Sequence, residues 1–177
     1  RVLVEHGITH DTSVYKGGCQ GGNVCYDYRN AYDNLLTYRA SSEDINLPDP
    51  VGDLWEMPIY TEMRPFWDSI SPIRIFRMVR AKFHKHKHQS QPQSVTADKN
   101  DNRKLSLRSF FVKSPLKMDF NQVNGRGLIR MMKNIMRRAK REHLEYVDVI
   151  LIGHSKTFVP YNEKTLRPFL EWIKHNS

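Results

Sequence analysis

A short apolar run near the end of the chain, Val147–Ile152, places the strongest constraint on how this sequence can fold. Its β-branched residues stop at Gly153, a pattern that is typical of a buried strand in a parallel sheet. In α/β folds the active site lies at the carboxyl ends of such strands. His154 therefore stands where a catalytic group would stand, although a histidine that only packs or caps the strand is the alternative at this position.

The residues before this run predict an amphipathic helix. Asn124 is a good N-terminal cap, and an apolar stripe follows it at helical spacing. The stripe consists of Leu128, Met132, Ile135, Met136 and Ala139. The opposite side carries Arg126, Arg130, Lys133, Arg137, Arg138, Lys140 and Arg141.

The end of the chain predicts a second helix, from Thr165 to His175. Thr165 would be its N-cap, and Pro168 would then lie in the first turn, where its missing N–H costs nothing. Helix, strand, a loop with His154 and a final helix form an αβα tail. This order of elements predicts the α/β fold class.

The N-terminal part of the chain offers two further strands. Val2–Gly7 looks like the end of a helix with a glycine cap, and Ile8–Val14 can form a strand after it. Leu54–Tyr60 is the second candidate, and Pro58 should place it at a sheet edge or at a strand end. Because the first residue is Arg1 and the chain would begin inside this predicted helix, we expect it to be a fragment or processed product of something longer.

The middle of the chain changes in composition. Residues 73–83 are an apolar and basic mixture of helical type, whereas residues 84–104 contain almost no apolar residue. The second stretch predicts an exposed or disordered insertion. Its histidines, His84, His86 and His88, alternate with lysines whose charge opposes a bound cation, so we favour a solvated tract over a metal site. Otherwise the length of 177 residues suits a single domain spanning residues 1–177.

Charge and cysteine content limit the possible partners. The formal net charge of +9 favours anionic partners such as nucleic acid, acidic glycans or lipid head groups. Much of this charge comes from the basic helix, whose basic side equally suits the solvated face of a helix covering a sheet, so nucleic acid is less favoured. No apolar run is long enough to span a membrane. Cys19 and Cys25 could close a disulfide in their glycine-rich loop, but free thiols are favoured.

Several different short motifs follow one another along the chain. Gly7–Val14 reads Gly-Ile-Thr-His-Asp-Thr-Ser-Val, and Leu54–Pro58 reads Leu-Trp-Glu-Met-Pro. Tyr26–Arg29 lies between them, and Met118–Phe120 and Val149–His154 follow. In this order they resemble the C-terminal half of the NodB-homology polysaccharide deacetylases. The departures are Phe120 in place of the family's tryptophan, and Ser155-Lys156-Thr157 after the histidine.

The resemblance implies a fold and an activity. Family members form a distorted (β/α)7 barrel and remove acetyl groups from N-acetylated polysaccharides with a divalent, zinc-like metal. This chain would supply only the latter strands and helices of the barrel. His154 would protonate the departing sugar amine, because an imidazole titrates near neutral pH, and Asp119 would orient it. Asp11, Tyr15 and Lys156 would contact the substrate.

The family's metal ligands are not found in this sequence. Its Asp-Asp pair does not occur here, and its H-[ST]-x-x-H loop is matched only in spacing, by His6 and His10 with Gly7 between them. We therefore expect the metal ligands to lie outside this chain, which alone would be inactive. Two alternatives stay open, a non-catalytic carbohydrate-binding relative and a basic nucleic-acid-binding domain.

Overall fold

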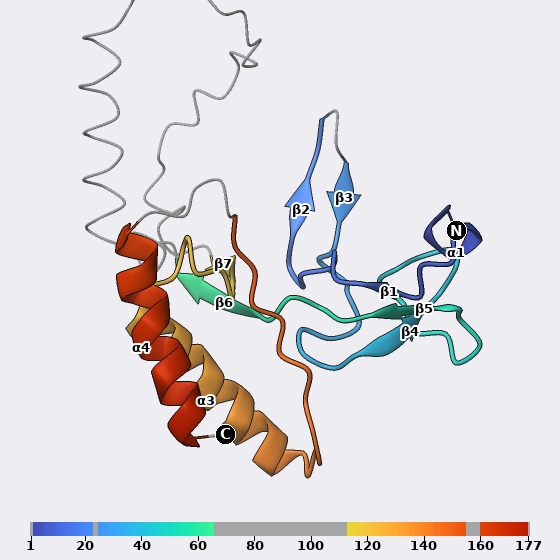
Figure 1. The fold of residues 1–177 in the computed structure, drawn as a ribbon. Coiled ribbons are helices and arrows are strands. Elements are labelled where there is room, and N and C mark those ends of the chain that lie inside the picture. Colours follow the sequence, from blue (N-terminus) through green and yellow to red (C-terminus); the bar gives the residue numbers. More distant parts are fainter. Residues whose placement is uncertain (1, 23–24, 66–112, 155–159, 177) are drawn as a thin grey trace, which may run out of the picture. The chain divides into compact units, whose positions relative to one another are not determined.

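The computed structural model describes residues 2–22, 25–65, 113–154 and 160–176. The chain divides into two compact units, Arg1–Met63 with Pro115–Ser177, and Arg64–Ser114. Nearly all described residues belong to the first unit, and Figure 1 draws the described elements in colour. The predicted helix at 73–83, the predicted insertion at 84–104 and Lys156 lie outside the described residues.

A three-stranded sheet contains β1 (His10–Asp11), β5 (Leu54–Glu56) and β4 (Tyr38–Ala40), in the order β1-β5-β4. β1 runs parallel to β5, and β4 runs antiparallel to it. β5 ends two residues before Pro58, which has no N–H to continue a ladder. The strand end predicted from this proline is therefore confirmed, and β5 lies in the centre of the sheet.

Two further strand pairs complete the β structure. β2 (Cys19–Gln20) lies in the segment predicted as a glycine-rich loop and pairs antiparallel with β3 (Tyr26–Asp27), which follows that loop, and β6 (Thr61–Pro65) pairs with β7 (Lys113–Lys117). Cys19 and Cys25 are exposed free thiols. The strands of the described residues form three separate sheets and no closed barrel, but the mixture of strands and helices confirms the α/β class.

The short helix α1 (Val2–Glu5) ends just before Gly7, where the sequence predicted a glycine cap. Gly7 has φ of +74°, a left-handed conformation that a residue without Cβ adopts readily. Its N–H donates to the carbonyl of Val4 at 2.9 Å, and the N–H of Ile8 donates to the carbonyl of Leu3 at 2.9 Å. These two bonds form a Schellman motif, which satisfies carbonyls that the end of the helix leaves open.

The helix α3 (Gly125–Arg141) anchors the hydrophobic core. Asn124 caps it as predicted, with its side-chain oxygen accepting the N–H of Gly127 at 2.8 Å. Its buried residues are Leu128, Met131 and Ile135, whereas Met132 is partly buried and Met136 is 41% exposed. The predicted stripe is thus rotated by about one position, because the helix packs against elements distant in sequence. The core around it includes Leu35, Tyr60, Leu116, Met118, Val123 and Phe169.

The predicted strand at Val147–Ile152 is wrong as a continuous strand. The segment makes only two isolated parallel bridges, Ile59 with Ile150 and Asp119 with Ile152. Neither bridge extends into a ladder, because Pro58 lacks an N–H beside Ile59 and the chain turns directly after Asp119. The predicted parallel direction is correct, and Val147, Val149 and Leu151 pack against the core.

The final helix α4 (Pro160–Asn176) starts earlier than predicted. Pro160 occupies its first position, where a proline is favoured, so Thr165 is not the N-cap and Pro168 lies inside the helix. Thr165 is buried with 7% exposure because its backbone lies against the start of α3. Figure 1 shows α3 and α4 side by side, and the two helices pack against each other.

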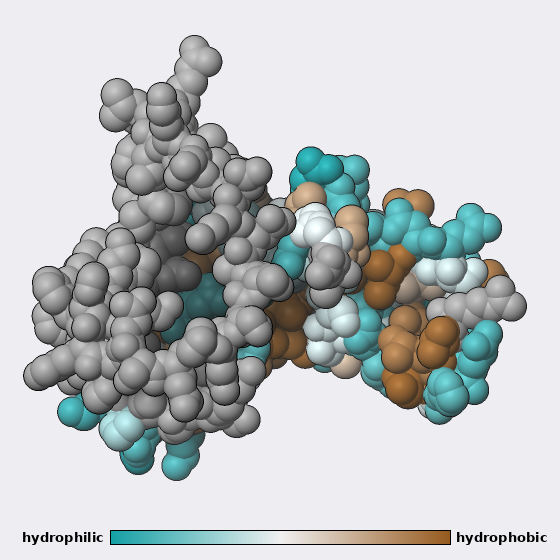
Figure 2. Space-filling model, turned by 90° about the horizontal axis from the view of Figure 1, so that it is seen from above, coloured by the Kyte–Doolittle hydropathy of each residue, from teal (hydrophilic) through white to brown (hydrophobic). Residues whose placement is uncertain are grey.

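None of the helices in the described ranges is long and apolar enough to cross a membrane. Some large apolar side chains are nevertheless exposed, among them Val2, Leu47 and Val51. Figure 2 shows brown, hydrophobic surface interrupted by teal, hydrophilic residues. Scattered apolar residues of this kind are ordinary on a protein surface.

We expect Gly125→Ala to destabilise the fold. A Cβ at position 125 would lie 2.5 Å from the carbonyl oxygen of Thr165, so α3 and α4 would have to separate. The expected loss is about 1–3 kcal/mol in the free energy of unfolding, measured by urea denaturation. Gly21→Ala is the matched control, since a Cβ there meets nothing within 4 Å. A gain of about 1 kcal/mol, as helix propensity alone would give, would contradict the close approach.

Candidate functional site

His154 lies at the carboxyl end of the segment that bridges Ile59 and Asp119. Its side chain is exposed, as a group that meets a substrate has to be. Its backbone N–H donates to the side-chain oxygen of Asn121 at 2.6 Å. The main chain at His154 is therefore held against the turn that follows Asp119.

Asp119 builds that turn. It is 1% exposed, and its carboxylate accepts the N–H of Asn121 at 2.8 Å and the side-chain amide of Gln122 at 2.7 Å. Its backbone carbonyl accepts the N–H groups of Gln122 and Val123. The structure thus brings the two predicted catalytic residues into one neighbourhood, and the connection from Asp119 to His154 runs through Asn121.

Gly153 allows the approach of an aromatic ring just before His154. A Cβ at position 153 would lie 2.0 Å from ring carbons of Phe120. The ring of Phe120, which replaces the tryptophan of the resembled family, therefore lies directly against the backbone of Gly153. This packing, together with the hydrogen bond that the N–H of His154 donates to Asn121, restricts the backbone that carries His154.

A second group of polar residues lies on the three-stranded sheet. Asp11 on β1 and Glu56 on β5 stand opposite each other in the parallel register. Glu56 is 0% exposed, and its Oε1 accepts the N–H of Val14 at 3.0 Å. Its Oε2 is buried and has no hydrogen-bond partner within the part of the chain that the structure describes. Asp11 is half-buried and accepts the hydroxyl of Ser13 at 2.9 Å.

Burial controls the protonation of Glu56. Loss of solvent raises the pKa of Glu56 to about 7, against the hydrogen bond from Val14, and the neighbouring Asp11 raises it further. Tyr38, opposite Glu56 on β4, is buried, and its hydroxyl donates to the carbonyl of Ile45 at 2.7 Å. Glu56 can therefore hold a proton near neutral pH.

Tyr15, a predicted substrate contact, lies in a cluster of three half-buried tyrosines. Its hydroxyl is hydrogen-bonded to that of Tyr26, and the rings of Tyr26 and Tyr28 stack with centroids 5.0 Å apart. The ammonium of Lys117 lies 4.4 Å from the ring centroid of Tyr15. Burial raises the pKa of Tyr28, and Glu56 and Asp11 raise it further, so the cluster and the carboxyl pair share one electrostatic neighbourhood.

The histidines of the His6–His10 pair lie on either side of the end of α1. His6 follows the last helical residue, and His10 is on β1, with its Nδ1 2.8 Å from the hydroxyl of Thr9. They do not share a helical face, because Gly7 interrupts the helix. Among the described residues, no three His, Cys, Asp or Glu side chains are grouped so that they could hold a metal ion. The described residues therefore do not provide a ligand set for the divalent metal that the resemblance implies.

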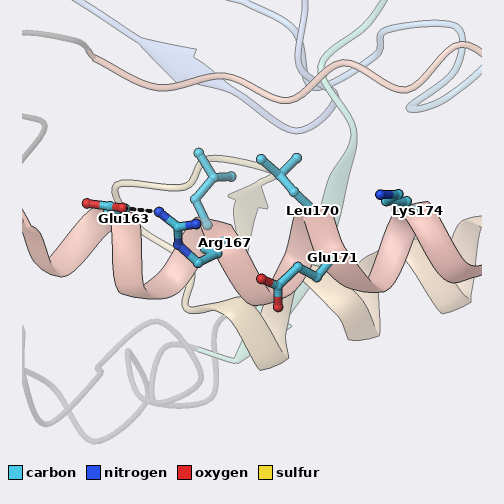
Figure 3. Close-up of a pocket in the computed structure, with 6 residues that line it drawn as sticks. Glu163, Arg167, Leu170, Glu171 and Lys174 are labelled. Carbon is cyan, nitrogen blue, oxygen red and sulfur yellow. Dashed lines mark hydrogen bonds and ion pairs between the residues drawn. The ribbon is translucent and has the colours of Figure 1, made fainter.

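A cavity of about 370 Å³ lies along α4. It is lined by Glu163, Leu166, Arg167, Leu170, Glu171 and Lys174. Figure 3 shows Arg167, Leu170 and Glu171 projecting from the helix, with Arg167 paired to Glu163. The cavity contains none of the predicted site residues. Its lining of two leucines and four charged residues does not include the predicted acid or its positioning residue.

Glu56 and Asn121 were missed as site residues by the sequence analysis. The burial of Glu56 could have been predicted from the sequence. Side chains two positions apart in a strand point to the same face, so Glu56 lies on the same buried face as Leu54. The role of Asn121 could not have been predicted, because it depends on the return of the chain 33 residues later. Lys156 lies outside the described residues.

We expect the stability of the protein to fall as the pH rises from 5 to 8 because of Glu56. Below its ordinary pKa of 4.5 this carboxyl is protonated in the folded and unfolded states, so its burial costs nothing. Between 4.5 and about 7 the folded state binds more protons than the unfolded state, so stability decreases with pH. Above about 7 the full cost of about 3 kcal/mol is present.

Glu56→Gln isolates this effect. Urea unfolding between pH 5 and 8 should show a flatter stability profile for Glu56→Gln than for the wild type, and greater stability at pH 8. Glu43→Gln, at an exposed position, should leave the profile unchanged. Parallel profiles for Glu56→Gln and the wild type would mean that Glu56 does not titrate in this range.

Comparison of the chain with protein-family models, with curated proteins and with solved structures gave no match in any of the three.

Proposed function

We propose that this chain is part of a polysaccharide deacetylase, a hydrolase that cleaves the amide bond of N-acetylated sugars with the help of a divalent metal. It would contribute the latter part of a distorted (β/α)7 barrel. The main support is the position of His154. The histidine follows a segment with parallel bridges to Ile59 and Asp119, and Asn121 holds its backbone.

His154 would act as the acid. Hydrolysis adds water oxygen to the acetyl carbon and breaks the bond from that carbon to the sugar nitrogen. The departing nitrogen needs a proton, which an imidazolium near neutral pH can supply. The products are acetate and a free sugar amine, and the proton that the imidazole gave up returns from the attacking water.

The remaining parts of such a site would come from elsewhere. The ligands of the metal and the group that accepts the proton of the attacking water would lie outside the described residues. Asp119 would act as a positioning residue, since its carboxylate orders the turn whose Asn121 holds His154. Asp11, Tyr15 and Lys156 remain proposed substrate contacts.

His154→Gln tests this function in the intact protein. Glutamine keeps a polar side chain but cannot donate a proton from a cationic ring, so we expect acetate release from chitin-type oligosaccharides to fall about 100-fold or more. Stability in urea should change little, because the side chain is exposed. His175→Gln, at an exposed position near the end of α4, is the matched control.

The outcomes separate the proposed roles. Unchanged turnover for His154→Gln would remove the acid assignment. A wild-type protein that binds the oligosaccharide without releasing acetate would instead favour the non-catalytic carbohydrate-binding relative.

A further inference from the structure

One side of α3 presents an unbroken row of positive charge. Six exposed cations lie on this side, five of them three or four positions apart and the sixth directly after the fifth. They form what we name the cationic ridge, made of Arg126, Arg130, Lys133, Arg137, Lys140 and Arg141. With a rise of about 1.5 Å per residue, the ridge is roughly 20 Å long.

The positive charge of the ridge is not balanced by acidic residues within α3. α3 contains no acidic residue, so neighbours along the ridge repel each other where a solvated helix face usually carries both signs. The helix dipole favours cations in the last turn, but it opposes Arg126 in the first turn, which has no acidic residue. α3 itself therefore supplies no opposite charge to the ridge, and an anion bound along the ridge would reduce the repulsion between neighbouring cations.

Arg138, on the same helix, has a structural role, because it forms an ion pair with Asp33. It lies off the ridge, is partly buried, and donates to both carboxylate oxygens of Asp33 at 2.9 and 2.7 Å. It also donates to Asn34 and Glu142. On the ridge, Arg141 pairs with Glu142 and Lys133 lies 5.8 Å from the ring centroid of Trp172, both at exposed positions.

The ridge starts close in sequence to the turn that holds the backbone of the proposed acid. Asn124 caps α3 three residues after Asn121, whose side chain holds the backbone of His154. Arg126 lies in the first turn after this cap, and the other ridge residues follow toward the end of the helix. A polymer bound along the ridge would therefore have one part near His154.

We propose that the cationic ridge binds a linear acidic polysaccharide, so that the substrate of this chain is an N-acetylated glycan that also carries carboxylates. The choice of a polysaccharide rests on the proposed function. A membrane is less suited, because the apolar side of α3 is buried in the core and cannot insert. Single-stranded nucleic acid is also less suited, because α3 contains no aromatic residue on which bases could stack.

Two oligosaccharides of equal length provide the test with the full chain. Hyaluronan oligosaccharides carry N-acetyl groups and carboxylates, whereas chitin oligosaccharides carry N-acetyl groups alone. The double variant Arg126→Gln and Arg137→Gln removes two ridge charges. We expect its affinity for hyaluronan to fall about tenfold, with a weaker dependence on salt and unchanged affinity for chitin oligosaccharides.

The double variant Lys164→Gln and Lys174→Gln is the matched control. It removes the same charge from exposed positions at similar spacing on α4, and its affinity for hyaluronan should change less than twofold. An equal loss in both double variants would overturn the proposal, because only net charge would then matter. Unchanged affinity of the ridge variant, or tighter wild-type binding to a single-stranded oligonucleotide of equal charge, would also overturn it.

The proposed function has a separate readout. Acetate release from neutral chitin oligosaccharides by the intact protein depends on His154 and not on the ridge. Its failure would count against the deacetylase, whereas loss of hyaluronan affinity in the ridge variant decides the binding surface.

Discussion

The burial of one side of α3 is the interaction on which the rest of the structure depends. Leu128, Met131 and Ile135 are each at most 2% exposed. They pack in one cluster with residues of β7, of α4 and of the segment before β6, and partly buried residues at 147–151 cover the cluster. Because this side must face the core, the opposite side with its six cations must face solvent. The orientation of the cationic ridge is thus a consequence of core packing.

Three residues, Met118, Asp119 and Asn121, connect the hydrophobic core to the backbone of His154. Met118 is fully buried, its N–H donates to the carbonyl of Tyr60, and its carbonyl accepts the N–H of Ile152. Asp119 then turns the chain, and Asn121 in that turn holds the backbone of His154. An exposed histidine is in this way fixed by bonds that begin in the hydrophobic core. Such support is what a proton donor needs, because its position relative to a substrate has to be reproducible.

The carboxyl pair of Asp11 and Glu56 is a local conflict in an otherwise consistent sheet. The central strand of a sheet favours apolar residues, yet Glu56 at the end of β5 is completely buried, and one of its oxygens has no hydrogen-bond partner among the described residues. Natural proteins keep such conflicts mainly at functional or strained sites. The pair lies beside the tyrosine cluster that includes Tyr15, a proposed substrate contact.

The sequence by itself determined the features that depend on neighbours in the chain. The Gly7 cap, the Asn124 cap, the end of β5 before Pro58 and the basic side of α3 all follow from local stereochemistry or helical spacing. Only the tertiary structure decided that Val147–Ile152 forms isolated bridges and that Glu56 and Asn121 belong to the candidate site. These features depend on segments that are far apart in the chain, and a residue pattern carries no information about which distant segment will lie beside it.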